Sequence, residues 1–200
     1  SETIEAVANE ELINAHRDDW QARWQALADF RARKNSPGAS HSALSQLNTT
    51  AAQWRRRVQC NAQPPASASS HQLGDVLLHA FPDRIGKQHE ADPLRYQLAS
   101  GKMARINPDS ALYGEPWLCA SELKFEASVA LILRAAPIDQ HRLQDDFPER
   151  FIEQDSVRWD DRQNALVARR EVRFGQITLS SKPAGKVDPE RAADALCAVI

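Results

Sequence analysis

The 200-residue sequence predicts an α+β fold, in which a helical region precedes a small antiparallel β-barrel or sandwich. Apolar residues recur every three or four positions as far as Ala80, which is typical of helices. From Leu94 onward they alternate with polar residues, which is typical of strands. Three alternating runs joined by short turns over residues 155–181 indicate an antiparallel meander. The predicted organisation is a helical region over 1–90, a barrel over 91–185 and the start of a truncated helix over 186–200.

Three helices are predicted in the first part, over residues 3–34, 43–60 and 72–80. Pro and Gly in residues 35–42 break the first from the second, residues 61–70 form a connector, and Pro82 ends the third. The apolar spacing favours a small helical bundle. Three tryptophans fit its core better than a base-stacking surface: Trp20, Trp24 and Trp54.

The second part is predicted to be mainly strands. After a polar stretch over residues 86–93, residues 94–99 and 102–106 read as a hairpin, and residues 117–123 and 129–135 as two further strands. A short helix is expected within residues 137–147. The meander then follows, and we expect its strands to close the same sheet.

The middle strand of the meander, residues 165–174, has two unlike faces because successive side chains of a strand point to opposite sides. One face is mostly apolar: Leu166, Ala168, Arg170, Val172 and Phe174. The other is mostly charged and positive: Val167, Arg169, Glu171 and Arg173. Such a sheet could bind an anionic polymer.

Composition limits the function. The net charge of −2 argues against strong, indiscriminate binding of nucleic acid, so any such contact must come from local clusters of arginine. Cys60, Cys119 and Cys197 are far apart and are read as reduced cytosolic thiols without a disulfide framework. No apolar run reaches the ~20 residues that span a bilayer, and no signal peptide is visible.

Several kinds of catalytic site are excluded by motif. None of the three Gly-Lys pairs has a glycine five residues earlier or a following Ser or Thr, so there is no P-loop to hold phosphates. The Asp-Glu dipeptide is absent, as are GxSxG and closely spaced pairs of Cys or His that could bind a metal. Asp145-Asp146 and Asp160-Asp161 are expected to be solvated or capping residues. We therefore expect no catalytic residues, metal or cofactor in this chain.

Four segments carry a family resemblance: LLHAFPDRIG at 77–86, RYQLASGKMARI at 95–106, PWLCASEL at 116–123 and the pattern WDDRxxxLVARREVRFGxxxLS in the meander. In this order and spacing they resemble the C-terminal accessory region of the HrpB-type bacterial DExH-box ATP-dependent RNA helicases, over roughly residues 73–183. The resemblance implies an OB-like barrel behind a helical domain, in a cytoplasmic parent protein that binds ATP and Mg. It also implies that the chain was cut from something longer.

The resemblance points to single-stranded RNA as a partner, bound by phosphate contacts and weakly by this region alone, beside the rest of the helicase chain. The candidate contact residues are Arg169, Arg173, Lys102, Arg105 and Arg84. Each has a structural alternative: Arg169 and Arg173 could form cross-strand ion pairs, and Arg84 could fix the junction between the two halves. Tyr96 could stack on a base, although a core position is commoner. Docking of a protein partner, or a purely structural role, remains the alternative function.

Overall fold

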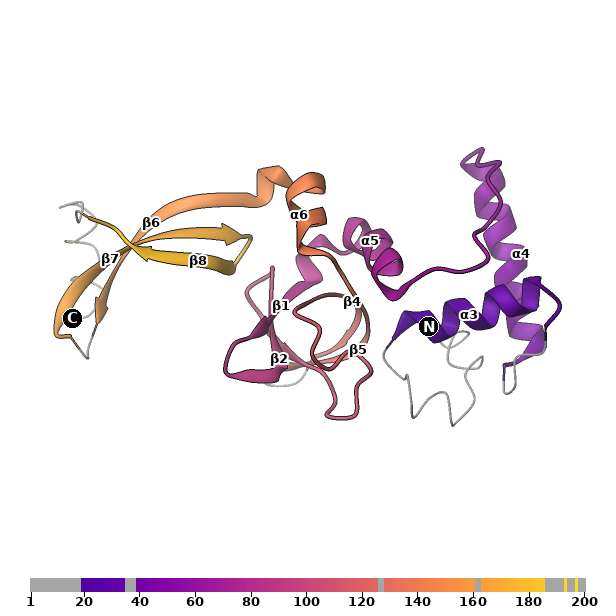
Figure 1. The fold of residues 1–200 in the computed structure, drawn as a ribbon, viewed down its shortest axis with the longest axis horizontal. Coiled ribbons are helices and arrows are strands. Elements are labelled where there is room, and N and C mark those ends of the chain that lie inside the picture. Colours follow the sequence, from indigo (N-terminus) through magenta and orange to yellow (C-terminus); the bar gives the residue numbers. More distant parts are fainter. Residues whose placement is uncertain are drawn as a thin grey trace.

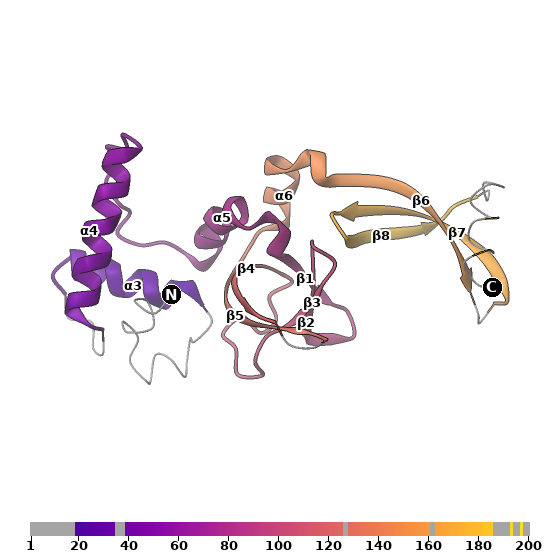
Figure 2. The same cartoon turned by 180° about the vertical axis from the view of Figure 1, so that it is seen from behind.

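The computed structural model describes residues 19–34, 39–125, 128–160 and 163–185, together with residues 193 and 197. The molecule is elongated, with two helices at one end, a closed barrel in the middle and a three-stranded sheet at the other end (Figure 1, and from behind in Figure 2). The α+β class and the order of helices before barrel are therefore confirmed. Most of the N-terminal half of the first predicted helix and nearly all of the helix predicted after residue 186 lie outside the described residues.

The three predicted helices are present as α3 (Trp20–Arg31), α4 (His41–Arg57) and α5 (Ser70–Ala80). Each begins at a polar N-cap, Asp19, Ser40 or Ser69, whose side chain accepts a hydrogen bond from a backbone amide of the first turn. α3 and α4 form a small core of their own, whose α4 members are Ala43, Leu44 and Leu47.

The predicted burial of Trp54 is wrong, since 58% of it is exposed. It lies on the same apolar stripe of α4 as Leu47, but α4 is longer than α3 and its last turns extend past the contact with α3 (Figure 1). Trp20 and Trp24 are partly buried, in agreement with the prediction.

The barrel has five strands: β1 (Ile85–His89), β2 (Asp92–Leu98), β3 (Met103–Arg105), β4 (Trp117–Lys124) and β5 (Ala130–Pro137). It closes in the order β1-β2-β3-β5-β4, and every pair is antiparallel except β3 with β5. The interior contains fully buried side chains that include Tyr96, Leu98, Leu118 and Ile132. The OB-like barrel is thus confirmed.

Strand β1 was not predicted from the sequence. Its segment, IGKQH, has a single large apolar residue and no alternation of apolar and polar residues. Its place is decided by packing: Ile85 is fully buried, and Gly86 lies against Leu98 of β2. β1 is also the strand that closes the barrel by pairing with β4.

The meander does not belong to the barrel, contrary to the predicted boundary of 91–185. It forms a separate sheet of β6 (Phe151–Asp160), β7 (Ala165–Phe174) and β8 (Ile177–Pro183). The reason is that each of the five barrel strands already has two hydrogen-bonded neighbours, so no edge remains for a sixth. The predicted short helix is present as α6 (Gln140–Asp146), and the 3-10 turn η2 (Pro148–Arg150) leads from it to β6.

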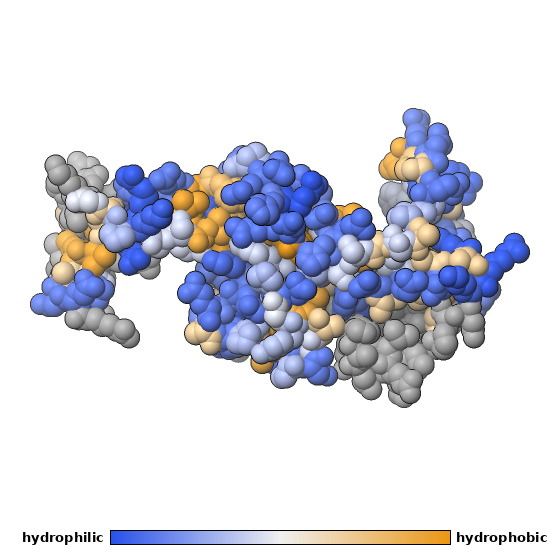
Figure 3. All heavy atoms as spheres, viewed as in Figure 1, coloured by the Kyte–Doolittle hydropathy of each residue, from blue (hydrophilic) through white to orange (hydrophobic). Residues whose placement is uncertain are grey.

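A second core joins the parts. Phe174 and Ile177 of the second sheet pack with Leu78 of α5, Trp117 of β4 and Leu143 of α6, all nearly or fully buried. The space-filling view shows hydrophobic residues gathered over the end of the second sheet that faces α6, on an otherwise largely hydrophilic surface (Figure 3). No helix among the described residues is long and apolar enough to cross a membrane.

Candidate nucleic-acid interface

An exposed cation and an exposed aromatic ring meet beside the β2–β3 turn. The turn uses Gly101 with φ +87°, a conformation that favours glycine, and Lys102 follows it. The Lys102 Nζ lies 4.4 Å from the ring centroid of Phe125, which is 60% exposed and directly follows β4. The barrel therefore presents a positive charge and a stacking surface at one place on its outside.

Two further arginines lie on the neighbouring strands. Arg95 of β2 and Arg105 of β3 are directly opposite each other in the strand register. Arg95 has an ion pair with Asp92, with 3.7 Å between Nε and Oδ2, and Arg105 is half-buried with contacts of its own. Like charges placed opposite each other repel, and the carboxylate of Asp92 offsets part of this repulsion at Arg95.

Tyr96 is a core residue, as the commoner alternative predicted. It is fully buried inside the barrel, and its hydroxyl donates to the carbonyl of Glu115 at 2.7 Å. A ring in this position is not accessible to a base, whereas the ring of Phe125 beside Lys102 is exposed.

Arg169 and Arg173 bind the neighbouring strand and turn. The Arg169 guanidinium donates from Nε to the hydroxyl of Ser181 at 2.6 Å and from Nη2 to its carbonyl at 3.2 Å. The Arg173 Nη2 donates to the carbonyl and side-chain oxygens of Gln176 at 3.1 and 3.2 Å. Glu171, between them, is 3% exposed. Both arginines thus hold the β7–β8 hairpin together, and their role toward RNA stays a prediction.

Arg170 of β7 is paired with two acidic residues of β6. Its Nε and Nη2 donate to the two carboxylate oxygens of Asp155 at 2.9 and 3.3 Å, and Glu153 lies 3.6 Å from Nε. The hydrogen bond and charge of Asp155, followed by the charge of Glu153, raise the pKa of Arg170. The residue is exposed, because this part of the sheet extends beyond the second core.

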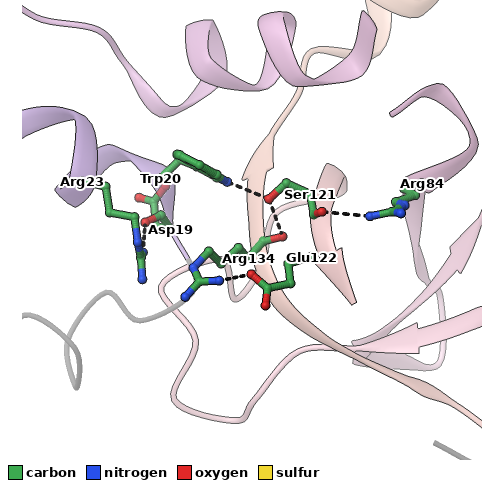
Figure 4. Close-up of polar contacts among 7 residues, drawn as sticks. All are labelled: Asp19, Trp20, Arg23, Arg84, Ser121, Glu122 and Arg134. Atoms are coloured by element: carbon green, nitrogen blue, oxygen red, sulfur yellow. Dashed lines mark hydrogen bonds and ion pairs between the residues drawn. The ribbon is translucent and has the colours of Figure 1, made fainter. Parts of the chain in front are cut away.

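Arg84 lies in the junction between the helical region and the barrel. Its Nη1 donates to the carbonyl of Ser121 at 2.8 Å, and its guanidinium lies 5.0 Å from the ring centroid of Phe81. The hydroxyl of Ser121 accepts from Trp20 Nε1 at 2.8 Å, and the buried Arg134 is paired with Glu122 beside it (Figure 4). These contacts fit the structural alternative for Arg84.

The five predicted residues do not form one site. Arg173 donates to Gln176, and a Cβ added at Gly101, the neighbour of Lys102, would lie 3.3 Å from the Gln176 Cγ. Arg105 lies on the strand that follows the Lys102 turn, whereas Arg84 is held at Ser121. Sequence reasoning missed Phe125, although an aromatic residue between Lys124 and Glu126 is a signal of an exposed ring.

No group of three or more His, Cys, Asp or Glu among the described residues could hold a metal ion. All three cysteines are free, with Cys60 and Cys197 exposed and Cys119 buried. Burial, and to a lesser degree the charge of Asp83, raises the pKa of Cys119 to about 12, which keeps it a protonated thiol.

Comparisons with known proteins agree with this architecture. Residues 150–184, from η2 through the second sheet, match the family described as ATP-dependent RNA helicase HrpB, connector region. Over 183 residues the chain is 31% identical to the ATP-dependent RNA helicase HrpB of Escherichia coli (strain K12), a match that covers 88% of this chain and 22% of that protein.

Two solved structures share the fold. The crystal structure of the E. coli DExH-box NTPase HrpB matches with a TM-score of 0.59 and 28% identity, over 96% of this chain and 25% of that one. The crystal structure of the Escherichia coli DEAH/RHA helicase HrpB has a TM-score of 0.54 at 23% identity, over 96% of this chain and 24% of that one, and supports the fold alone. The chain spans about a quarter or less of the length of these relatives. In sequence and in fold, the chain is similar to the part of the HrpB-type ATP-dependent RNA helicases that contains the HrpB connector region.

Proposed function

We propose that this chain is an accessory region of a cytoplasmic ATP-dependent RNA helicase, in which the barrel helps to hold single-stranded RNA. ATP and Mg would be bound by the remainder of such a protein, because the P-loop and Asp-Glu motifs are absent from this sequence. The observation that carries the proposal is the pairing of Lys102 with the exposed ring of Phe125, on a barrel with the similarity described above.

The chemistry of this place suits a single strand. Phe125 offers an apolar face on which a base can stack, and Lys102 offers a charge for the adjacent phosphate. Arg105 and Arg95 extend the positive surface along β2 and β3, the strands that OB-type barrels use for oligonucleotides. Such contacts read the backbone and the base faces, so the binding is independent of sequence.

Arg173 and Arg169 contribute in a second way. Arg173 donates to Gln176, which lies beside Gly101 in the β2–β3 turn, and Arg169 holds the opposite end of the β7–β8 hairpin. Each guanidinium has five donors, so the donors that remain after binding the hairpin can contact phosphate. In this arrangement the same arginines shape the second sheet and add positive charge beside the barrel.

Fluorescence anisotropy with a short single-stranded RNA tests the proposal on this chain at several salt concentrations. Phe125→Ala should weaken binding by about 1–3 kcal/mol, the usual contribution of one stacked base. Lys102→Gln should also weaken binding, and the slope of log K against log salt should become shallower by the amount that corresponds to about one phosphate contact. Lys182→Gln is the matched control, since it removes the same charge from an exposed site on β8. Equal RNA binding by the unchanged chain and by all three variants would reject the barrel site.

A second candidate function is a scaffold or docking module for protein. It is favoured by one observation: Arg84, Arg169 and Arg173 all donate to main-chain carbonyls within the chain itself. If RNA binding is absent even at low salt, and Arg173→Ala lowers thermal stability, the scaffold becomes the better description.

A further inference from the structure

The charge of the α3–α4 end differs from that of the rest of the chain. No Asp or Glu occurs between residues 30 and 74, although the whole chain has an excess of acidic residues and a net charge of −2. Six cations lie in the same stretch: Arg31, Arg33, Lys34, Arg55, Arg56 and Arg57. This end of the molecule is therefore strongly positive within a protein that is slightly negative.

Two cavities open on this end, and both have basic linings. One, of about 530 Å³, lies where α3 ends and α4 begins and is lined by Phe30, Arg31, Arg33, Lys34, His41 and Asn48. The other, of about 690 Å³, lies at the C-terminal end of α4, and its lining includes Arg55, Arg56, Gln59 and Asn61. None of the described residues that line either cavity is acidic.

The cavities share one face of α4. Asn48 of the first cavity and Ala52 and Arg55 of the second lie on α4, and Ala52 and Arg55 are four and seven positions after Asn48, which places the three on a single stripe. Asn48 and Arg55 are about 10 Å apart along the axis, at 1.5 Å per residue.

The cations on this face have no acidic partner in the part of the chain that the structure describes. Among the described residues, none of Arg31, Arg33, Lys34 and Arg55 has an ion pair with a carboxylate. Arg31 donates from Nε to Asn48 at 2.9 Å, which brings it onto the α4 face. Burial, and then the nearby charge of Arg55, lower the pKa of Arg31. An anion between Arg31 and Arg55 would relieve this repulsion.

We propose that this face of α4, together with the end of α3, binds the phosphate backbone of single-stranded nucleic acid. The surface is defined by Arg31, Arg33, Lys34, Arg55 and Arg56 and is separate from the Lys102 and Phe125 site on the barrel (Figure 1). Cations at both ends of one helix face suit a polymer that has one charge per residue. The surface goes beyond the proposed function and does not depend on it.

The test is the binding of the 200-residue chain to fluorescent oligouridine and oligothymidine across a range of salt. The variant Arg33→Gln/Lys34→Gln/Arg56→Gln changes three exposed side chains. For three lost contacts the slope of log K against log salt should become shallower by about 2, which is a loss of up to about 100-fold at about 0.1 M salt. The loss should be equal for RNA and DNA, because only phosphates are contacted.

A pair of single variants provides the matched control. Arg56→Gln removes a charge from the proposed face, whereas Arg57→Gln removes the same charge about 100° further around α4, where Arg57 lies 5.1 Å from the ring centroid of Trp54. Arg56→Gln should weaken binding more. Equal effects of the two, or unchanged binding by the triple variant, would overturn the proposal. Thermal unfolding of each variant confirms that it is folded.

Two further results separate this proposal from its alternatives. If polyglutamate binds the chain as tightly as oligouridine, and only its binding is lost in the triple variant, the surface recognises acidic protein and the proposal is wrong. If Lys102→Gln has no effect while the triple variant has the expected effect, the barrel proposal fails and the α4 surface stands.

Discussion

The backbone amide of Gln176 donates a hydrogen bond to the carbonyl of Ala99 at 3.0 Å, and this contact joins the second sheet to the barrel. The Gln97 side chain adds a bond to the carbonyl of Gln176 at 2.9 Å. Phe174 and Ile177, on either side of the turn, are fully buried in the core shared with α5 and α6. The β7–β8 turn is therefore the place where the second sheet is fixed on the barrel.

Gly175→Ala should loosen this joint. Gly175 has φ +54°, and an added Cβ would lie 2.8 Å from the carbonyl oxygen of Ala99. The left-handed conformation alone costs about 1–2 kcal/mol for a residue with a side chain, and the close contact adds to it. Gly114→Ala is the control, since Gly114 has φ +88° with no atom within 4 Å of the added Cβ. Urea unfolding should show a clearly larger loss for Gly175→Ala; equal losses would mean that the joint tolerates a side chain.

Gly74→Ala should strongly destabilise the chain, although alanine favours a helix over glycine by about 1 kcal/mol. Gly74 is the point at which α5 approaches the barrel, and an added Cβ would clash with the carbonyl oxygen of Pro137. Relieving such a contact requires α5 to move, with a typical cost of about 1–3 kcal/mol or more. Thermal unfolding should show a lower midpoint than for Val76→Ala, which changes a residue of α5 that is 69% exposed.

The buried thiol of Cys119 should make stability fall at alkaline pH. Its pKa is raised from the ordinary value of 9.0 to about 12, so between these values the folded chain keeps a proton that the unfolded chain loses. The free energy of unfolding should then decrease by about 1.4 kcal/mol per pH unit between pH ~9 and ~12. Cys119→Ala should lack this decrease, which urea unfolding across the pH range would show.

Alkylation provides a separate check on the same thiol. Iodoacetamide at mildly alkaline pH should modify the exposed Cys60 and Cys197 in the folded chain but not Cys119. Rapid labelling of Cys119 under native conditions would contradict both its burial and its raised pKa.

Arg169→Lys should separate the two roles of Arg169. Lysine keeps the charge but cannot reproduce the two donors that reach the hydroxyl and carbonyl of Ser181. We expect the free energy of unfolding to fall by about 1.5–3 kcal/mol, the usual range for hydrogen bonds from a charged group. The salt dependence of RNA binding should be unchanged, because the charge is kept. Arg170→Lys, at an exposed and solvent-screened ion pair, should cost clearly less than Arg169→Lys. A shallower salt slope for Arg169→Lys would show that guanidinium geometry itself is needed by the RNA.

The local structure could be read from the sequence. Apolar spacing located α4 and α5, the turn at Ser100 and Gly101 located the β2–β3 hairpin, and alternation located the three strands of the meander. These features depend on residues close to one another in the chain, so hydrophobic periodicity and turn residues are sufficient to find them. The motif resemblance likewise needed only the order of short segments.

The arrangement of these elements was decided by tertiary packing. β1 has almost no apolar pattern and is a strand because Ile85 and Gly86 fit between β2 and β4. The meander forms its own sheet because the barrel closes without it. Phe125 and Lys102 meet only because a loop and a hairpin distant in sequence lie side by side. Sequence patterns report which face of an element is apolar, whereas the partner of that face depends on chain closure and shape, which only the folded structure determines.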